Sequence, residues 1–179
     1  MLKLVPLSAR HAPDLAALAG DGPDLPWTTS SQRSALQNVL AFVARVQRLR
    51  ARDAHETFAI CDADRLLGLA VLARDPSAPD HAELGYWIAR PNRSRGYATA
   101  AVRQLLSHGF SRMNLALVSA RCPSVNRASA HVVEKLGFRF IGIEPSQDPT
   151  SPAEPVRRYE LTGHEWRRSP RTHESADYS

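Results

Sequence analysis

Hydrophobic and polar residues first alternate along the chain and then follow a helical period. Alternation over 3–7 predicts a strand, and Ser8 is a suitable N-cap for a helix to about residue 19. A second, longer helix is expected to begin at Ser30 or Ser31 and to end near residue 50. The apolar residues that share one face of this helix at the required spacing are Leu36, Leu40, Val43 and Val46.

The period then changes to that of a sheet. Six short apolar stretches predict strands: 57–61, 66–72, 81–88, 115–121, 138–143 and 156–161. Helices are expected between them, after Gly96 to about 113 and from Asn126 to about 136. The order β-α-α-β-β-β-α-β-α-β-β predicts an α/β fold, a mixed sheet with helices on its faces. We expect one domain over 1–162 and a polar, mobile tail over 163–179.

Composition narrows the class of protein. The chain has 179 residues, and its 43% hydrophobic and 23% charged residues are ordinary for a globular domain. It has no apolar run of about 18 residues, so we expect no membrane span. Two cysteines make no disulfide framework or metal-ligand spacing, and a reducing cytoplasm is the expected location. The net charge of +5 favours anionic partners, of which a nucleotide cofactor is one.

A basic turn follows the strand over 84–88. The segment Arg93-Ser-Arg-Gly-Tyr-Ala-Thr99 leads directly into a predicted helix. The first amides of a helix lack helical partners, and the helix dipole adds positive charge there, so this turn predicts an anion site. Gly96 allows a positive φ and a close approach of the backbone. The chain lacks both G-x-x-x-x-G-K-[ST] and G-x-G-x-x-G, which leaves R-x-x-G-x-A, a spacing that an exposed basic turn would also have.

Two motifs together carry a resemblance to a known family. Glu83-Leu-Gly-Tyr-Trp-Ile followed by Arg93–Thr99, and then Asn126-Arg-Ala-Ser with Glu134-Lys-Leu-Gly-Phe, resembles the GCN5-related N-acetyltransferases (GNAT). The branch it resembles includes the ribosomal-protein alanine and serine N-acetyltransferases, in which Pro26-Trp27 is also common. The resemblance covers about residues 2–162. It implies a sheet whose central strands splay apart around acetyl-CoA, the expected cosubstrate.

The resemblance also implies site residues. The amides of the turn would hold the pyrophosphate of acetyl-CoA, and the backbone of Trp87 and Ile88 would contact the pantetheine arm. The turn residues concerned are Arg93, Ser94, Arg95, Gly96, Tyr97, Ala98 and Thr99. Ser94 stands where the family commonly has glycine, and Ala100 where it commonly has glutamate, so the turn is expected to hold the cofactor slightly differently.

Three further residues are candidates for the chemistry. Glu83 is the expected general base, and in the resembled family an acidic residue on this strand often acts through water. The resemblance also implies Ser129 as the acid and Asn126 as a contact for the pantetheine amide. Each also has an ordinary structural alternative: a surface glutamate, a serine in the first turn of a helix, and an N-cap. No histidine pairs with a cysteine or aspartate at ligand spacing, so no metal is expected.

The chemistry of acetyl transfer favours one acceptor class. An α-amine has a pKa near 8 and a lysine side chain near 10.4, so neutral lysine is harder to reach by about 3 kcal/mol. We therefore expect a protein or peptide N-terminal amine. Small amines such as antibiotics or polyamines, and a non-catalytic acyl-CoA-binding module, remain alternatives. Nucleic acid is disfavoured because basic and aromatic residues do not interleave. An exposed final strand leaves a homodimer open.

Overall fold

The computed structural model describes residues 1–18, 34–145 and 154–169. They form a seven-stranded sheet in the order β1-β2-β3-β4-β5-β7-β6. The strands are β1 (Leu2–Pro6), β2 (His55–Asp62), β3 (Arg65–Asp75), β4 (Ala78–Ile88), β5 (Leu117–Pro123), β6 (Arg139–Glu144) and β7 (Val156–Thr162). Every neighbouring pair is antiparallel except β4 and β5, so the predicted mixed sheet is confirmed.

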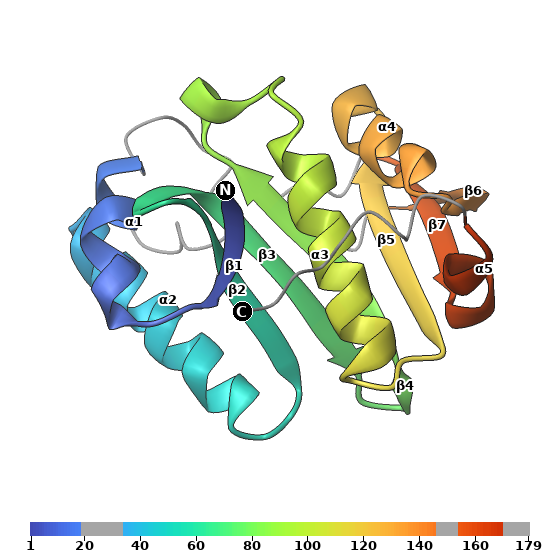
Figure 1. Ribbon diagram of the computed structural model, residues 1–179, viewed down its shortest axis with the longest axis horizontal. Coiled ribbons are helices and arrows are strands. Elements are labelled where there is room, and N and C mark those ends of the chain that lie inside the picture. The colour runs from blue at the N-terminus through green and yellow to red at the C-terminus, as the bar shows by residue number, and fades with distance from the viewer. Residues whose placement is uncertain (19–33, 146–153, 170–179) are drawn as a thin grey trace.

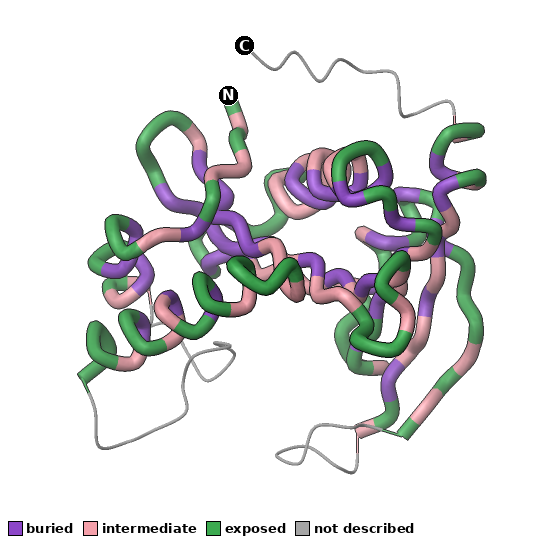
Figure 2. Tube along the Cα trace, turned by 90° about the horizontal axis from the view of Figure 1, so that it is seen from below, coloured by how far each residue is buried: buried purple, intermediate pink, exposed green. Residues whose placement is uncertain are grey.

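Five α-helices accompany the sheet among the described residues: α1 (Ala12–Leu18), α2 (Ala35–Arg50), α3 (Tyr97–Ser111), α4 (Arg127–Lys135) and α5 (Gly163–Arg168). Figure 1 shows α3 lying across one face of the sheet, with α1 and α2 at the β1–β2 end. Short 3-10 turns, Ala9–His11 and Arg90–Asn92, precede α1 and α3. In Figure 2 the buried positions gather along the sheet and on the inward sides of the helices.

Two hydrophobic clusters divide the sheet by face. The larger joins α3, α4 and α5 to even-numbered residues of β4 and β5, such as Leu84 and Val118. The smaller joins α1 and α2 to the opposite face of β2 and β3, with Trp87 packed against it. Odd-numbered residues of β4 therefore face away from α3, as the period of a strand requires.

Helix α2 begins later and turns a different face inward than the sequence predicted. Its N-cap is Ser34, whose side chain accepts from the Gln37 amide at 3.3 Å, and not Ser30 or Ser31, which lie outside the described residues. Val39, Val43 and Val46 are buried, whereas Leu36 and Leu40 are exposed. The two interpretations share Val43 and Val46, and Val39 completes a stripe at three- and four-residue spacing.

The end of the domain also differs from prediction. Instead of a polar tail from Gly163, helix α5 follows β7 directly, and its Trp166 joins the larger core cluster. Thr162 and Glu165 form a capping box at its start, a signal present in the sequence. Residues 170–179 lie outside the described residues, and the domain boundary remains a prediction.

The strand that was expected to pair across a dimer does not lie at an edge of the sheet. The last strand in sequence, β7, lies between β5 and β6, so its two edges are paired. The edge strand is β6, where Phe140, Ile141 and Ile143 are exposed. The homodimer remains a prediction, but pairing of two copies through an unpaired β7 is wrong, because β7 is already paired on both sides.

Gly68 is expected to be essential for the close contact between β3 and β4. A Cβ at this position would clash with the main-chain oxygen of Trp87, so Gly68→Ala must push the strands apart. We expect a loss of about 1–3 kcal/mol in the free energy of unfolding, measured by urea denaturation. The control is Gly142→Ala on β6, where a Cβ meets open space. Equal stability of the two variants would contradict this account.

Burial of His11 is expected to make stability depend on pH. The Ser8 amide donates to Nδ1 of His11 at 3.1 Å, and that atom accepts only when unprotonated. Burial and the nearby charge of Arg10 lower the pKa of His11. The unfolded chain therefore binds this proton more readily, so the contribution is complete above pH about 6.5 and is lost as the pH falls.

The measurement is the urea midpoint at about pH 7.5 and about pH 5.5, one unit either side of the free histidine pKa of about 6.5. His11→Gln should lose less stability between the two conditions than the unaltered chain. The exposed His131→Gln is the matched control and should keep the full dependence. Burial also lowers the pKa of His55 and His108, so part of the dependence should survive in His11→Gln.

Candidate active site

The parallel strands β4 and β5 pair over only part of their length. The ladder runs from His81 opposite Leu117 to Leu84 opposite Ala120 and then stops. Beyond it, β4 continues along β3 as far as Ile88, and β5 continues along β7 as far as Pro123. The two strands therefore diverge towards their carboxyl ends, as Figure 1 shows. This matches the splayed strands that the resemblance implies.

The divergence leaves main-chain groups of β4 without a partner strand on one side. The Ala89 amide donates to Leu67 on β3 at 2.9 Å. Because the groups of a strand point alternately to its two sides, Trp87 also faces β3, and Tyr86 and Ile88 face the gap. Of the two predicted pantetheine contacts, the backbone of Ile88 faces the gap and that of Trp87 faces β3; both contacts remain predictions.

The turn after β4 presents a row of uncapped amides. Gly96 is the N-cap of α3 with φ 79°, and no side chain caps the helix there. The first helical bond joins the Ala100 amide to the Gly96 oxygen at 3.0 Å. Within the described part of the chain, the amides of residues 94–99 have no hydrogen-bond partner. This arrangement, with the N-terminal end of the helix dipole behind it, suits an anion.

Side-chain hydrogen bonds hold the turn against the end of β4 and against β3. Arg93 Nε donates to the Ile88 carbonyl at 2.9 Å, and Arg65 donates to the buried Asn92 side chain. Ser94 adopts φ 60°, a left-handed conformation that disfavours a side chain, at the position where the family commonly has glycine. Arg93 thus has a structural bond that the sequence did not predict, while Arg95 is exposed.

A second helix N-terminus borders the gap from the β5 side. Asn126 caps α4 by accepting from the Ser129 amide at 3.0 Å, so its ordinary structural role is confirmed. The Ser129 hydroxyl lies 2.9 Å from the Tyr86 hydroxyl and 3.4 Å from the Cys122 sulfur. These three side chains come from α4, β4 and β5 and meet where the strands diverge.

Burial sets the protonation of two of these groups. It raises the pKa of Tyr86 to about 12 and also raises that of the Cys122 thiol. Both groups therefore keep their protons near neutral pH and can donate hydrogen bonds.

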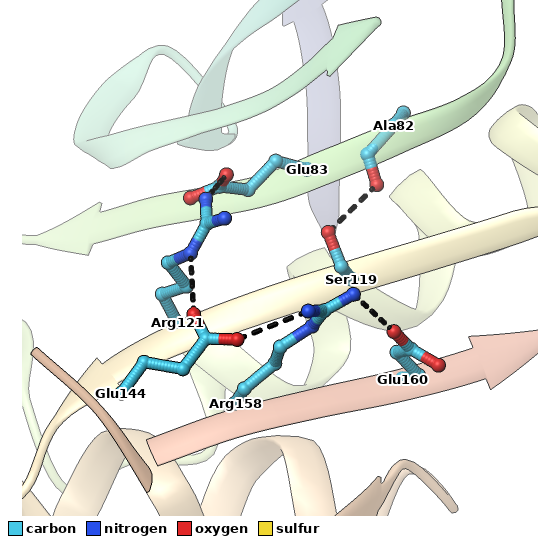
Figure 3. Close-up of polar contacts among 7 residues, drawn as sticks. All are labelled: Ala82, Glu83, Ser119, Arg121, Glu144, Arg158 and Glu160. Atoms are coloured by element: carbon cyan, nitrogen blue, oxygen red, sulfur yellow. Dashed lines mark hydrogen bonds and ion pairs between the residues drawn. The ribbon is translucent and has the colours of Figure 1, made fainter. Parts of the chain in front are cut away.

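Glu83 lies on the opposite face of the sheet, within a chain of ion pairs (Figure 3). Its carboxylate contacts Arg121, whose Nε lies 3.6 Å from Glu144. Arg158 then joins Glu144 at 3.0 Å to Glu160 at 2.6 Å. Three carboxylates thus share two guanidinium groups, an excess of one negative charge on a chain of net charge +5. The arginine pairs lower the pKa of Glu144.

This face also carries a pocket of about 330 Å³. It extends from the end of β3 across β4 and β5 to β7, and Glu83, Ser119 and Arg121 lie in its wall. Glu83 is 42% exposed, so its carboxylate is accessible from the pocket. The two candidates for proton transfer therefore lie on different faces of the sheet, Glu83 beside this pocket and Ser129 in the first turn of α4.

Sequence reasoning located the turn and the cap but missed Tyr86, Arg121 and Cys122. The alternation of β4 places Tyr86 on the α3 face, a signal that was available, but its meeting with α4 depends on tertiary packing. Pro26 and Trp27 lie outside the described residues. Among described residues, no group of three or more histidine, cysteine or acidic side chains is arranged to hold a metal. The described helices include none long and apolar enough to cross a bilayer.

Comparison with known proteins agrees with this geometry. The family described as acetyltransferase (GNAT) domain matches residues 1–139. The Bacillus subtilis protein YnaD, an uncharacterized N-acetyltransferase, is 40% identical over 34% of this chain and 35% of its own. YdaF of the same organism, a putative ribosomal N-acetyltransferase, is 39% identical over 32% of this chain and 31% of its own. The matched stretches thus span about a third of these two relatives.

Solved structures share the fold over nearly the whole chain. RimL, a ribosomal L7/L12 alpha-N-protein acetyltransferase in complex with coenzyme A, has a TM-score of 0.78 at 19% identity, covering 90% of this chain and 93% of its own. A chimera of the spermidine N-acetyltransferase SpeG from Vibrio cholerae and hSSAT has a TM-score of 0.75 at 18% identity, covering 94% and 99%. At these identities the likeness establishes the fold.

The uncapped turn can be tested by a single methyl group. Gly96→Ala is expected to lower the free energy of unfolding by about 1 kcal/mol, because alanine resists the left-handed conformation. The same strain should turn the amides and weaken coenzyme A binding roughly tenfold, about the loss of one hydrogen bond to a charged group. Calorimetric titration measures the affinity.

Gly137→Ala is the matched control. Gly137 has φ 92° after the end of α4, and a Cβ there also meets open space. It should lose similar stability and keep its affinity for coenzyme A. Equal affinities in the two variants would exclude the turn as the anion site.

Proposed function

Since the chain belongs to the acetyltransferase (GNAT) family, a family of acetyl-CoA-dependent acyltransferases, we propose that it acetylates a primary amine. The favoured acceptor is the N-terminal α-amine of a protein or peptide, which attacks the thioester directly. The observation that carries this proposal is the row of uncapped amides over 94–99 beside the diverging ends of β4 and β5. Acetyl-CoA is the cosubstrate expected of this family.

The turn and the gap have different roles in binding. The amides of Ser94 to Thr99 would hold the pyrophosphate, with the exposed Arg95 adding charge. The pantetheine arm would then run along the gap-facing main-chain groups of Tyr86 and Ile88, with the side-chain amide nitrogen of Asn126 as a further donor. With its pyrophosphate and its pantetheine arm both bound, the cofactor would hold its thioester in place for attack. Such positioning supplies much of the rate in two-substrate reactions.

The acceptor would approach from the face that carries the pocket. The pocket wall carries Arg74, Arg121 and Arg158 against Asp75 and Glu83, so it has no excess of negative charge, and Glu83 lies where it can take a proton from the acceptor through water. Arg121 contacts the same carboxylate, so an acceptor cation competes with an internal one. At neutral pH a useful fraction of an α-amine is already neutral, which limits the work required of Glu83.

A polyamine is the second candidate acceptor. The shared fold with a spermidine N-acetyltransferase and the row of Glu83, Glu144 and Glu160 favour it.

Mass spectrometry separates the candidates after incubation with acetyl-CoA and three acceptors: a peptide with a free α-amine, the same peptide blocked at its N-terminus but containing lysine, and spermidine. Acetylation of the first alone supports the proposal. No release of coenzyme A with any amine, despite binding, would support a non-catalytic module.

Glu83→Gln tests the base. At pH 7 the variant should lose about tenfold in kcat, because only about a tenth of an α-amine of pKa near 8 is then neutral, and it should keep its affinity for coenzyme A. The deficit should narrow as the pH rises past about 8, since the α-amine then loses its proton unaided. Asp80→Asn, on the same strand but exposed and outside the ion-pair chain, is the control and should retain full activity. An undiminished kcat in Glu83→Gln would remove this residue from the mechanism.

A further inference from the structure

The Ser129 hydroxyl has two neighbours that can both donate to it. A serine oxygen accepts up to two hydrogen bonds and donates one. Tyr86 lies 2.9 Å from this oxygen, and the Cys122 thiol donates to it at 3.4 Å. Tyr86 also contacts the Ser129 carbonyl at 3.2 Å, a longer alternative for the same proton. When Tyr86 and Cys122 both donate to this oxygen, its acceptor positions are filled and the serine hydrogen points away from them.

These neighbours are dependable donors because they do not ionise near neutral pH. Tyr86 is half-buried against the core, and Cys122 is buried. Burial raises the pKa of both groups, to about 12 for Tyr86. A thiolate at Cys122 or a phenolate at Tyr86 would instead accept the serine hydrogen and remove it from the gap.

We propose that Tyr86 is a positioning residue for acetyl transfer: its hydroxyl, reaching from β4 to α4 across the strand gap, turns the Ser129 O–H towards the sulfur of coenzyme A. This inference rests on the proposed function, because it requires the thioester to lie in that gap. When the neutral amine attacks the carbonyl carbon, a C–N bond forms, the C–S bond breaks and its electron pair moves to sulfur, while the nitrogen releases one proton to water. Ser129 then stabilises the thiolate by a hydrogen bond, and solvent supplies the final proton.

The relative acidities argue against full proton transfer from this pair. A thiol has a pKa of about 8.5, so protonation of its thiolate by a phenol of pKa about 12 is unfavourable by roughly 5 kcal/mol. A directed hydrogen bond has no such cost. Tyr86 and Ser129 are therefore assigned to orientation and charge stabilisation, whereas the sequence indicated Ser129 as an acid.

The test compares coenzyme A with its analogue that lacks the thiol, by calorimetric titration between pH 7 and 9.5, a range that spans the thiol pKa of about 8.5. If the gap holds an oriented donor, coenzyme A should gain roughly tenfold in affinity over the analogue as its thiol ionises. In Tyr86→Phe, which keeps the ring and loses the hydroxyl, the gain should fall to about threefold or less. Ser129→Ala should abolish it, and the double variant should equal Ser129→Ala.

Tyr159→Phe is the matched control. It removes another core hydroxyl, which donates to Glu134 at 2.8 Å outside this cluster, and should keep the full gain. A gain that Tyr86→Phe leaves intact, or a Tyr86→Phe effect that persists without Ser129, would overturn the inference. A gain without acetylation of any amine would overturn the proposed function alone. Failure to bind coenzyme A would overturn both.

Discussion

The site depends on one interruption in the sheet, the end of pairing between β4 and β5 after Leu84 and Ala120. Buried main-chain groups almost always have hydrogen-bond partners, so where two strands separate, other groups must bond to the amides and carbonyls that are released. Here the outer edge of each strand is still held, by β3 and by β7, and the sheet does not unravel. What opens is a defined gap, with unpaired groups on the β4 side and two helix N-termini at its mouth.

This interruption explains why the parallel pair lies at the centre of an otherwise antiparallel sheet. Parallel strands bring their carboxyl ends to the same edge, so the helices that follow, α3 and α4, begin side by side. One N-terminus presents uncapped amides at residues 94–99, and the other presents Ser129 beside Tyr86. The opposite face carries Glu83 and the ion-pair chain. Under the proposed function, the cofactor and the acceptor would thereby be separated by one layer of backbone.

Local signals made the order of elements and the turn predictable. Gly96 and Asn126 lie where backbone geometry demands particular residues, and both act as N-caps. The buried face of a helix was harder to predict. Leu36 and Val39 are both apolar and lie one turn apart on α2, and only the docking of α2 on β2 decides which of them is buried. Helix α5 was missed although its capping box and Trp166 were visible, because polar residues surround them. The Tyr86–Ser129 contact joins residues 43 positions apart and has no local signal.

The proton requirements of the reaction explain why so few groups suffice. An α-ammonium with a pKa near 8 loses its first proton readily near neutral pH, and the second nitrogen proton, released as the amide forms, offsets the one that a thiolate of pKa near 8.5 takes up. The protein then has little proton transfer to force and much orientation to supply. In the proposed mechanism, a carboxylate already paired with Arg121 and a serine oriented by Tyr86 would be modest groups for acid–base chemistry. They are well suited to a reaction in which the positions of nitrogen, carbonyl carbon and sulfur decide the rate. A lysine acceptor would break this balance by more than two pKa units, which is the physical reason for preferring the α-amine.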